Sequence, residues 1–278
     1  HTITIKNKIN FPGLFPTSVI VKNLGILSSG TTTLVQYAGW FFAAYIGGIA
    51  TNCYSTGAIS GSGGGIFGFS SSGIATNCYS TGQLGDYGGG IFGQSSSGIA
   101  TNCYSTGGIG VQSGGIMGQD SVGITTNCYS TGTISANGGG ILGQTSSGIV
   151  TNCYSTGVIT GTGGGIFGLN SASAVTNCFH APNGWNDASA NKYLSGDISE
   201  NSTIWARQPG APLDTPYILT VFKKDNTSQI LITANSNLTQ LAANTTYVLT
   251  ADISMNAPFT SVGSNIVFDG SGHTITII

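Results

Sequence analysis

Short segments in which apolar and polar residues alternate run along most of this chain, and a glycine-containing bend separates each segment from the next. In one example, Ile74, Thr76 and Cys78 share one parity, while Asn77 and Tyr79 share the other. An alternation with a period of two is typical of β-strands, whose successive side chains point to opposite faces of a sheet. The pattern therefore predicts short strands joined by turns.

These segments recur at a constant interval along the chain. The phrase TNCYSTG occurs five times and decays to TNCFHAP in a sixth copy, and GGGIFG or a close variant lies between the copies. A degenerate copy upstream, in which Leu24 aligns with Ile49 and Phe42 with Phe67, extends the array from about residue 20 to about residue 180. The six cysteines of the chain all follow this interval: Cys53, Cys78, Cys103, Cys128, Cys153 and Cys178.

A repeat of this length could hold two helices or three short strands, and its composition decides between them. The units are rich in Gly, Ser and Thr and contain almost no Glu, Lys, Arg or Leu, which is the opposite of a helix-forming set. We therefore predict an all-β parallel β-helix, or β-solenoid, with three short strands in each coil of about 25 residues. Each strand would pair in parallel with the same strand of the next coil, about 4.8 Å away, so that identical side chains form ladders.

The alternation predicts which ladders lie inside the solenoid and which lie outside. We expect the cysteine column, a Thr column and two isoleucine columns to be buried. The first isoleucine column is Ile49, Ile74, Ile99, Ile124 and Ile149, and the second is Ile66, Ile91, Ile116, Ile141 and Ile166. A tyrosine column would lie outside and face any ligand: Tyr54, Tyr79, Tyr104, Tyr129 and Tyr154. Glycines at 57, 82, 107, 132 and 157 and at 68, 93, 118, 143 and 168 would occupy corners that need a positive φ.

The two repeated phrases carry a resemblance to a known family. NCYSTG followed by GGIFG is similar to the GLUG-type repeat of pectin-lyase-like, right-handed parallel β-helix proteins, found on bacterial surfaces and in large repetitive proteins of giant viruses. The resemblance covers about residues 20–180. It implies a right-handed coil and an exposed, elongated role rather than a reaction, because this architecture hosts lyases, adhesins, tail spikes and inert fibres alike.

The two ends of the chain match each other, since HTITI at 1–5 recurs at 273–277. Residues 1–180 are predicted to form one β-solenoid and 228–278 a second segment that starts the next period. Residues 181–227, with four prolines and two tryptophans, are expected to form an irregular connector or cap. Two interpretations stay open: the chain is one period of a longer protein whose repeats are as long as the offset between the two HTITI phrases, or the second segment is only homologous to the first.

Charge excludes several function classes. Between residues 49 and 168 the only charged residues are Asp86 and Asp120, and the whole chain has a formal net charge of −2. A chain of this charge offers no basic surface for nucleic acid, and the array itself offers no carboxylate pair for glycoside hydrolysis and no Asp cluster for calcium. It also lacks an apolar run long enough for membrane insertion. We therefore expect no catalytic residues, no metal and no cofactor, and we predict that the protein is not an enzyme.

Two further groups of residues bear on the chemistry and the location of the protein. The cysteine spacing is not a metal-binding pattern, and it leaves open either a column of buried free thiols or disulfides between neighbouring coils. Four sequons could carry glycans and would then place the protein on an extracellular, cell or virion surface: Asn201, Asn226, Asn237 and Asn244.

These observations favour a structural repeat protein that forms part of an elongated fibre or surface filament, with other copies of itself as partners. Near-identical coils suit a role in which length and stiffness matter. The alternative is an adhesin that binds surface glycans through the tyrosine column, since flat aromatic rings can stack on sugars. A polysaccharide lyase or hydrolase is the third, least favoured class.

Overall fold

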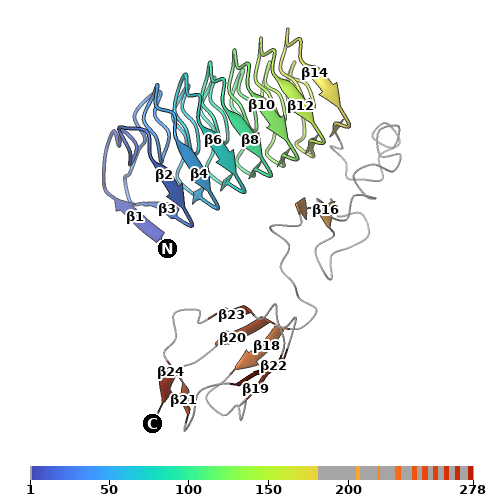
Figure 1. Cartoon of the computed structure of the whole chain (residues 1–278). Helices are drawn as coiled ribbons and strands as arrows, with labels where there is room; N and C mark the ends of the chain where they lie inside the picture. The colour runs from blue at the N-terminus through green and yellow to red at the C-terminus, as the bar shows by residue number, and fades with distance from the viewer. Residues whose placement is uncertain are drawn as a thin grey trace. The chain divides into compact units, whose positions relative to one another are not determined.

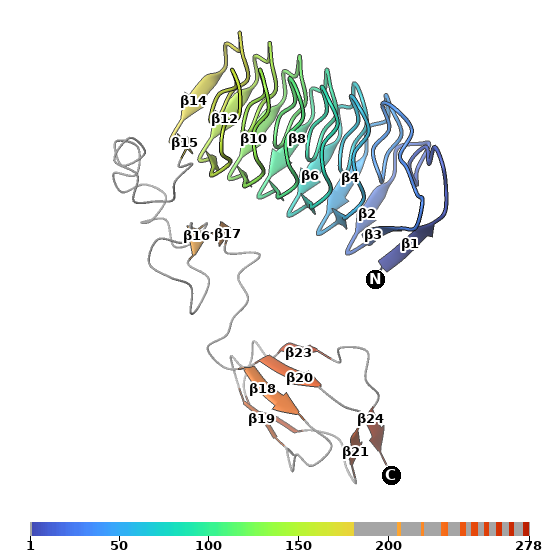
Figure 2. The same cartoon turned by 180° about the vertical axis from the view of Figure 1, so that it is seen from behind.

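The computed structural model of this chain describes residues 2–180 and, beyond them, the backbone of a set of short strands between residues 205 and 277. Residues 2–180 form a parallel β-solenoid of about seven coils, in which the strands lie side by side along the axis (Figures 1 and 2). It starts with β1 (Thr2–Lys6), β2 (Ile20–Lys22) and β3 (Gly25–Ser29), and each later coil then holds one three-residue and one two-residue strand.

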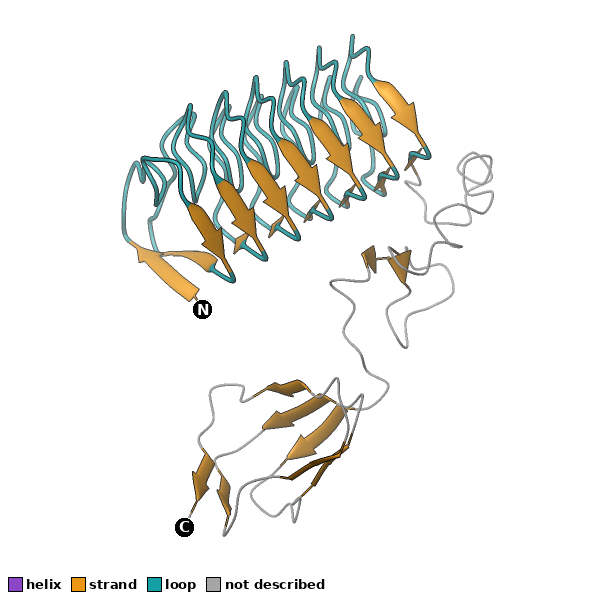
Figure 3. Cartoon of the chain, in the orientation of Figure 1, coloured by secondary structure: helices purple, strands orange, loops and turns teal. Residues whose placement is uncertain are grey.

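These strands build two parallel sheets (Figure 3). The seven-stranded sheet consists of β2 and the three-residue strands β4 (Ile49–Thr51), β6 (Ile74–Thr76), β8 (Ile99–Thr101), β10 (Ile124–Thr126), β12 (Ile149–Thr151) and β14 (Ala174–Thr176). The eight-stranded sheet consists of β1, β3 and the strands β5 (Tyr54–Ser55), β7 (Tyr79–Ser80), β9 (Tyr104–Ser105), β11 (Tyr129–Ser130), β13 (Tyr154–Ser155) and β15 (Phe179–His180).

The register places identical residues beside each other. Ile74 pairs with Ile99 of the next coil, and Tyr79 pairs with Tyr104. The glycine-rich third side has no continuous strand and is joined instead by isolated parallel bridges, such as the one between Phe67 and Phe92. The predicted fold class, an all-β parallel β-solenoid with coils of roughly 25 residues, is therefore confirmed.

The first coils depart from the regular spacing. Ile20, rather than Leu24, pairs with Ile49, so the alignment of Leu24 with Ile49 was wrong. Phe42 does pair with Phe67, as the sequence predicted. The coil that starts at Ile20 is therefore longer than the later ones. Its additional residues lie between β3 and the glycine-rich third side. The error arose because a constant period was assumed for a coil whose sequence has already diverged.

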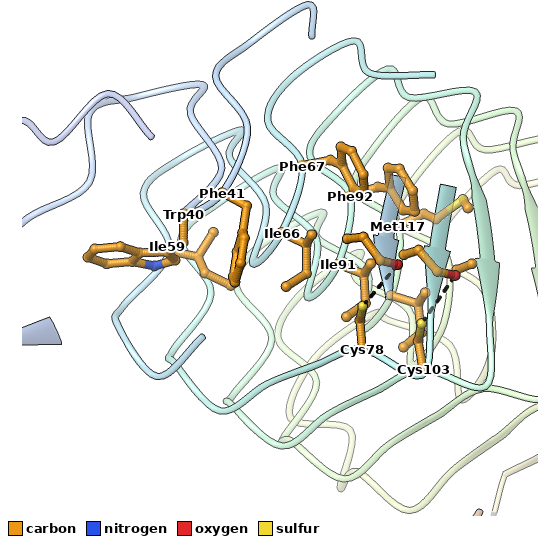
Figure 4. Packing of buried hydrophobic residues seen from close by; sticks show 14 of the residues in the cluster. Trp40, Phe41, Ile59, Ile66, Phe67, Cys78, Ile91, Phe92, Cys103 and Met117 are labelled. Carbon is orange, nitrogen blue, oxygen red and sulfur yellow. Dashed lines mark hydrogen bonds between the residues drawn. The ribbon is translucent and has the colours of Figure 1, made fainter. Parts of the chain in front are cut away.

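The core consists of continuous columns that run along the axis (Figure 4). Ile91 is fully buried, as are its counterparts at 66, 116 and 141, and the cysteines at 53–153 are buried with them. Ile166 and Cys178, near the end of the array, are partly buried. A further column follows the isoleucines directly: Phe42, Phe67, Phe92, Met117 and Leu142. Each such side chain contributes about 1.5–3 kcal/mol when buried, and only stacking of coils can bury it.

The other isoleucine column is exposed, which contradicts the expectation that it lies inside. Ile74, Ile99, Ile124 and Ile149 are on the outer face of the seven-stranded sheet, and Thr76 with its equivalents is partly exposed beside them. The middle residue of each strand points inward instead: Ala50, Ala75, Ala100, Thr125 and Val150. The alternation is interrupted because the asparagine after each of these strands adopts a left-handed backbone conformation, as Asn77 does with φ 53°. This turn reverses the parity, so Cys78 faces inward although Thr76 does not.

The corner glycines also have a different role from the one expected. None of the ten has a positive φ. Most residues that do have a positive φ are not glycines but asparagine, serine, tyrosine and a few others, and Gly48 is one of the few glycines among them. Glycine is required because the chain passes close to the neighbouring coil: a Cβ on Gly82 would lie 2.5 Å from the carbonyl carbon of Gly57 in the previous coil. Close approach of neighbouring backbones, rather than turn conformation, therefore selects these glycines.

Beyond residue 180, most of the described strands also pair in parallel. β18 (Gln229–Ile232) pairs with β20 (Thr246–Leu249), which pairs with β23 (Val267–Asp269). Two further parallel pairs are β19 (Gln240–Ala242) with β22 (Thr260–Val262) and β21 (Ile253–Met255) with β24 (Ile275–Ile277). The pair of β16 (Trp205–Ala206) and β17 (Ile218–Leu219) is antiparallel.

The chain splits into two compact units, of which the second holds Gln208–Ala211 and Lys223–Ile278. The predicted boundaries at 180 and 227, and the connector between them, stay predictions.

Candidate functional site

The tyrosine column points away from the buried serines that follow it, such as Ser80, but its rings are less exposed than the sequence suggested. The rings of Tyr54, Tyr79, Tyr104, Tyr129 and Tyr154 stack with centroid distances of 4.7–5.0 Å and interplanar angles of 2–6°. Tyr154 is only 1% exposed, and Tyr54, Tyr79 and Tyr104 are half-buried. The ring of Tyr54 lies over Gly25, where a Cβ would be 2.6 Å from the tyrosine hydroxyl.

Burial has a chemical consequence for these phenols. Desolvation, followed by the neighbouring tyrosine, raises the pKa of Tyr79, Tyr104, Tyr129 and Tyr154 above the ordinary value. Each ring within the stack also uses its faces to contact neighbouring rings. The ladder therefore does not present the free aromatic faces that sugar stacking would need.

The cysteine ladder consists of free thiols. The Cys78 thiol donates to the carbonyl of Ala50 in the previous coil at 3.5 Å, and the Cys103 thiol donates to that of Ala75 at 3.6 Å (Figure 4). The backbone N–H of Cys103 donates to the sulfur of Cys128 at 3.3 Å. Desolvation raises the pKa of Cys78, Cys103, Cys128 and Cys153, while the hydrogen bond from Cys153 lowers the pKa of Cys178. Inside this column, cysteine acts as a small apolar residue with a weak donor.

This arrangement predicts an uneven reaction with iodoacetamide. In the folded protein at pH 7.5, Cys178 should react first, because its thiol is partly exposed and its lowered pKa increases the thiolate fraction. The buried thiols should react only after unfolding in guanidinium chloride. Mass spectrometry without reduction would measure this, and fewer than six alkylated cysteines in the unfolded protein would reveal disulfides instead.

An asparagine ladder runs along the corner between the two sheets and was not anticipated from the sequence. From Asn52 onward, each side-chain amide donates to the amide oxygen of the asparagine one coil earlier, at 2.9–3.2 Å. The members are Asn23, Asn52, Asn77, Asn102, Asn127, Asn152 and Asn177. The strict repetition of TN in the sequence was the available signal. All these bonds point towards the N-terminus, so the ladder gives the solenoid a polarity.

A second unanticipated feature is an aromatic group on one edge of the solenoid, which we call the aromatic edge and define as Tyr37, Tyr45, Phe69 and Tyr87. Two turns of each coil meet at this edge, since the N–H of Phe69 donates to the carbonyl of Tyr37 and the N–H of Tyr45 donates to that of Phe69, both at 2.7 Å. The ring of Phe69 contacts those of Tyr37 and Tyr45 edge-to-face at 5.3 and 5.4 Å. Tyr37 is 43% exposed and Tyr45 is 72% exposed.

Within the described residues, no three His, Cys, Asp or Glu side chains lie close enough together to hold a metal ion. The same part of the chain contains no helix that is long and apolar enough to cross a membrane. The sequons at Asn201, Asn226, Asn237 and Asn244 lie outside the described residues.

The fold and its ladders define the chain as a parallel β-solenoid. Comparison with protein-family models, with curated proteins and with solved structures finds no match for this chain. The resemblance to GLUG-type repeats therefore stays a prediction.

Proposed function

We propose that this protein is a structural rod element, a segment of an elongated fibre or surface filament whose length is set by the number of coils. The observation that supports it best is the register. From β4 onward each coil places its residues beside the same residues of the next one, as Ile99 pairs with Ile124 and Tyr104 with Tyr129. Every added coil then lengthens the rod by about 4.8 Å without altering its cross-section.

The ladders give such a rod its stiffness. Buried isoleucines and cysteines, stacked tyrosine rings and the asparagine chain each connect neighbouring coils along the whole array. A catalytic or cofactor-binding role has no comparable support, because only two charged residues, Asp86 and Asp120, lie between 49 and 168, and each accepts a hydrogen bond from the next coil. We therefore propose a non-enzymatic protein without a cofactor.

We also propose where the protein acts and what it associates with. A fibre segment of this kind would act on an extracellular, cell or virion surface and would associate end to end with copies of itself or continue in a longer chain. The strands at the two ends of the sheets, β1 and β2 at one end and β14 and β15 at the other, are the natural points of contact, since strand edges template further pairing. The tyrosine column no longer supports the adhesin alternative, because its ring faces are occupied.

Adding coils tests the proposal. A variant with four additional copies of residues 76–100 should fold, and its subunit should be longer by about 19 Å in small-angle scattering and in electron micrographs of filaments formed at high concentration. The control is an insertion of half a repeat at the same place, which shifts the register and should destabilise the protein. An unchanged length would contradict an additive rod. Compact monomers at every concentration would contradict self-assembly, and depolymerisation of pectin-like polymers would contradict the non-enzymatic role.

A further inference from the structure

The aromatic edge is a local exception in an otherwise repeated surface. The column that holds Tyr37 and Tyr87 contains Ser62, Gln112 and Asn137 in other coils, and the column that holds Tyr45 contains Ser70, Ser95, Asp120, Thr145 and Asn170. Phe69 is followed by Gln94, Gln119 and Gln144. Since the coils with small or polar residues adopt the same structure, the solenoid does not need aromatic residues at these positions.

The backbone makes the tyrosines costly as well as unnecessary. Tyr37, Tyr45 and Tyr87 have φ values of 73°, 66° and 65°. Asparagine and aspartate tolerate this left-handed region, whereas a bulky side chain there is unfavourable. Unfavourable conformations of this kind are concentrated at ligand-binding sites. Tyr45 is 72% exposed, and Tyr37 and Tyr87 are 43% and 40% exposed, so burial in the core does not offset the cost.

The arrangement of the rings suits a ligand with a flat, weakly polar face. Phe69 supports Tyr37 and Tyr45 through edge-to-face contacts, which hold the two outer rings while leaving ring surface in solvent. Tyr87 stands two coils from Tyr37 in the same column, which is about 10 Å along the axis. The edge therefore offers a row of aromatic surfaces rather than a single pocket.

An amide and a carboxylate border these rings. Gln94, one coil beyond Phe69, is half-buried and donates to Gln119 at 3.2 Å and to Asp120 at 3.3 Å, which fixes its amide. Asp86, beside Tyr87, is exposed. Between residues 23 and 168, a range that includes all four residues of the aromatic edge, there is no Lys, Arg or His to attract an anion. Amides and carboxylates match sugar hydroxyls, and the absence of cations there disfavours acidic polymers.

We propose that the aromatic edge binds a neutral polysaccharide chain. The C–H faces of its sugar rings stack on Tyr37, Tyr45 and Tyr87, and its hydroxyl groups hydrogen bond to Gln94 and Asp86. This site is independent of the stacked tyrosine column and goes beyond a purely structural role. A rod that carries such a site near one end would hold a filament against a glycan-covered surface.

The test is affinity electrophoresis and calorimetry of the full chain with neutral polymers (xylan, mannan, a soluble β-glucan) and with acidic ones (polygalacturonate, heparin). We expect wild-type protein to bind at least one neutral polymer more tightly than the acidic ones. The double variant Tyr37→Ser with Tyr45→Ser, which copies Ser62 and Ser70, should bind about tenfold more weakly, while Tyr45→Phe should retain binding because the ring face remains.

Thermal unfolding separates this role from a structural one. Because serine is used at both positions one coil further on, the double variant should unfold at an unchanged or slightly higher temperature. The control Val158→Ala removes an exposed apolar side chain from another coil and should change neither property. Absence of binding to every neutral polymer, tighter binding of acidic polymers, or full binding by the double variant would overturn the proposal.

Discussion

Replacing Ile91 by aspartate should destabilise the solenoid by more than about 4 kcal/mol and unfold much of it at neutral pH. Ile91 is 0% exposed and lies in the core column between Ile66 and Ile116, where no basic group can pair with a carboxylate. The change removes a large apolar contact and buries a charge. Urea unfolding followed by circular dichroism would measure the loss of stability.

The pH dependence of the stability of this variant provides a second test that residue 91 is buried. A buried aspartate has a pKa above its unfolded-state value of about 3.9, since desolvation disfavours the charged form. The destabilisation from the charge is therefore greatest above the folded-state pKa and should decrease as the pH falls towards about 4. A deficit that does not change with pH would mean that the carboxylate reaches solvent.

Ile99→Asp provides the matched control. Ile99 is 37% exposed on the outer face of the seven-stranded sheet, so its aspartate variant keeps the new charge in water and should cost about 1 kcal/mol or less. Equal losses for the two variants would show that the assignment of inner and outer faces is wrong.

The contrast between Ile91 and Ile99 also shows which parts of the structure the sequence can predict. The constant spacing of the repeated phrases, the absence of helix formers and the alternation were sufficient to predict a parallel β-solenoid and the burial of Ile91 and Cys78. They were insufficient for Ile99, because the left-handed turn at the following asparagine, Asn102, changes the parity of the chain. Counting residues across a turn predicts which face a side chain points to only when the backbone conformation of that turn is known.

The candidate site was less predictable for a related reason. Repetition in the sequence directed attention to the tyrosine ladder around Tyr104, yet repeated residues are those that stabilise the stack, and these rings are covered by one another. The informative positions were exceptions to the repeat, such as Tyr45 and Phe69. They could be recognised only after the structure showed that two separate turns of each coil meet at one edge.

The second large effect is expected for Gly90→Ala. A Cβ on Gly90 would lie 2.6 Å from the Cβ of Ser105 and closer still to the carbonyl oxygen of Gly115 in the next coil. Neither group can move without separating the coils, because the adjacent N–H of Ile91 donates to the carbonyl of Ile116 at 2.9 Å. A single methyl group should therefore cost about 3 kcal/mol, measured as a lower urea midpoint. The effect spreads along the axis, since each coil is stabilised mainly by its neighbours.

Gly61→Ala is the control that separates the steric clash expected in Gly90→Ala from the general effect of replacing a glycine. The nearest atom to a Cβ on Gly61 is the carbonyl oxygen of Asp86 at 3.5 Å, which is an ordinary contact. This variant should be neutral or more stable by up to about 1 kcal/mol, because alanine reduces the conformational entropy of the unfolded chain. A similar loss in both variants would mean that glycine is selected at these positions for its backbone conformation after all. A loss confined to Gly90→Ala would establish that contact between neighbouring backbones keeps the repeat rich in glycine.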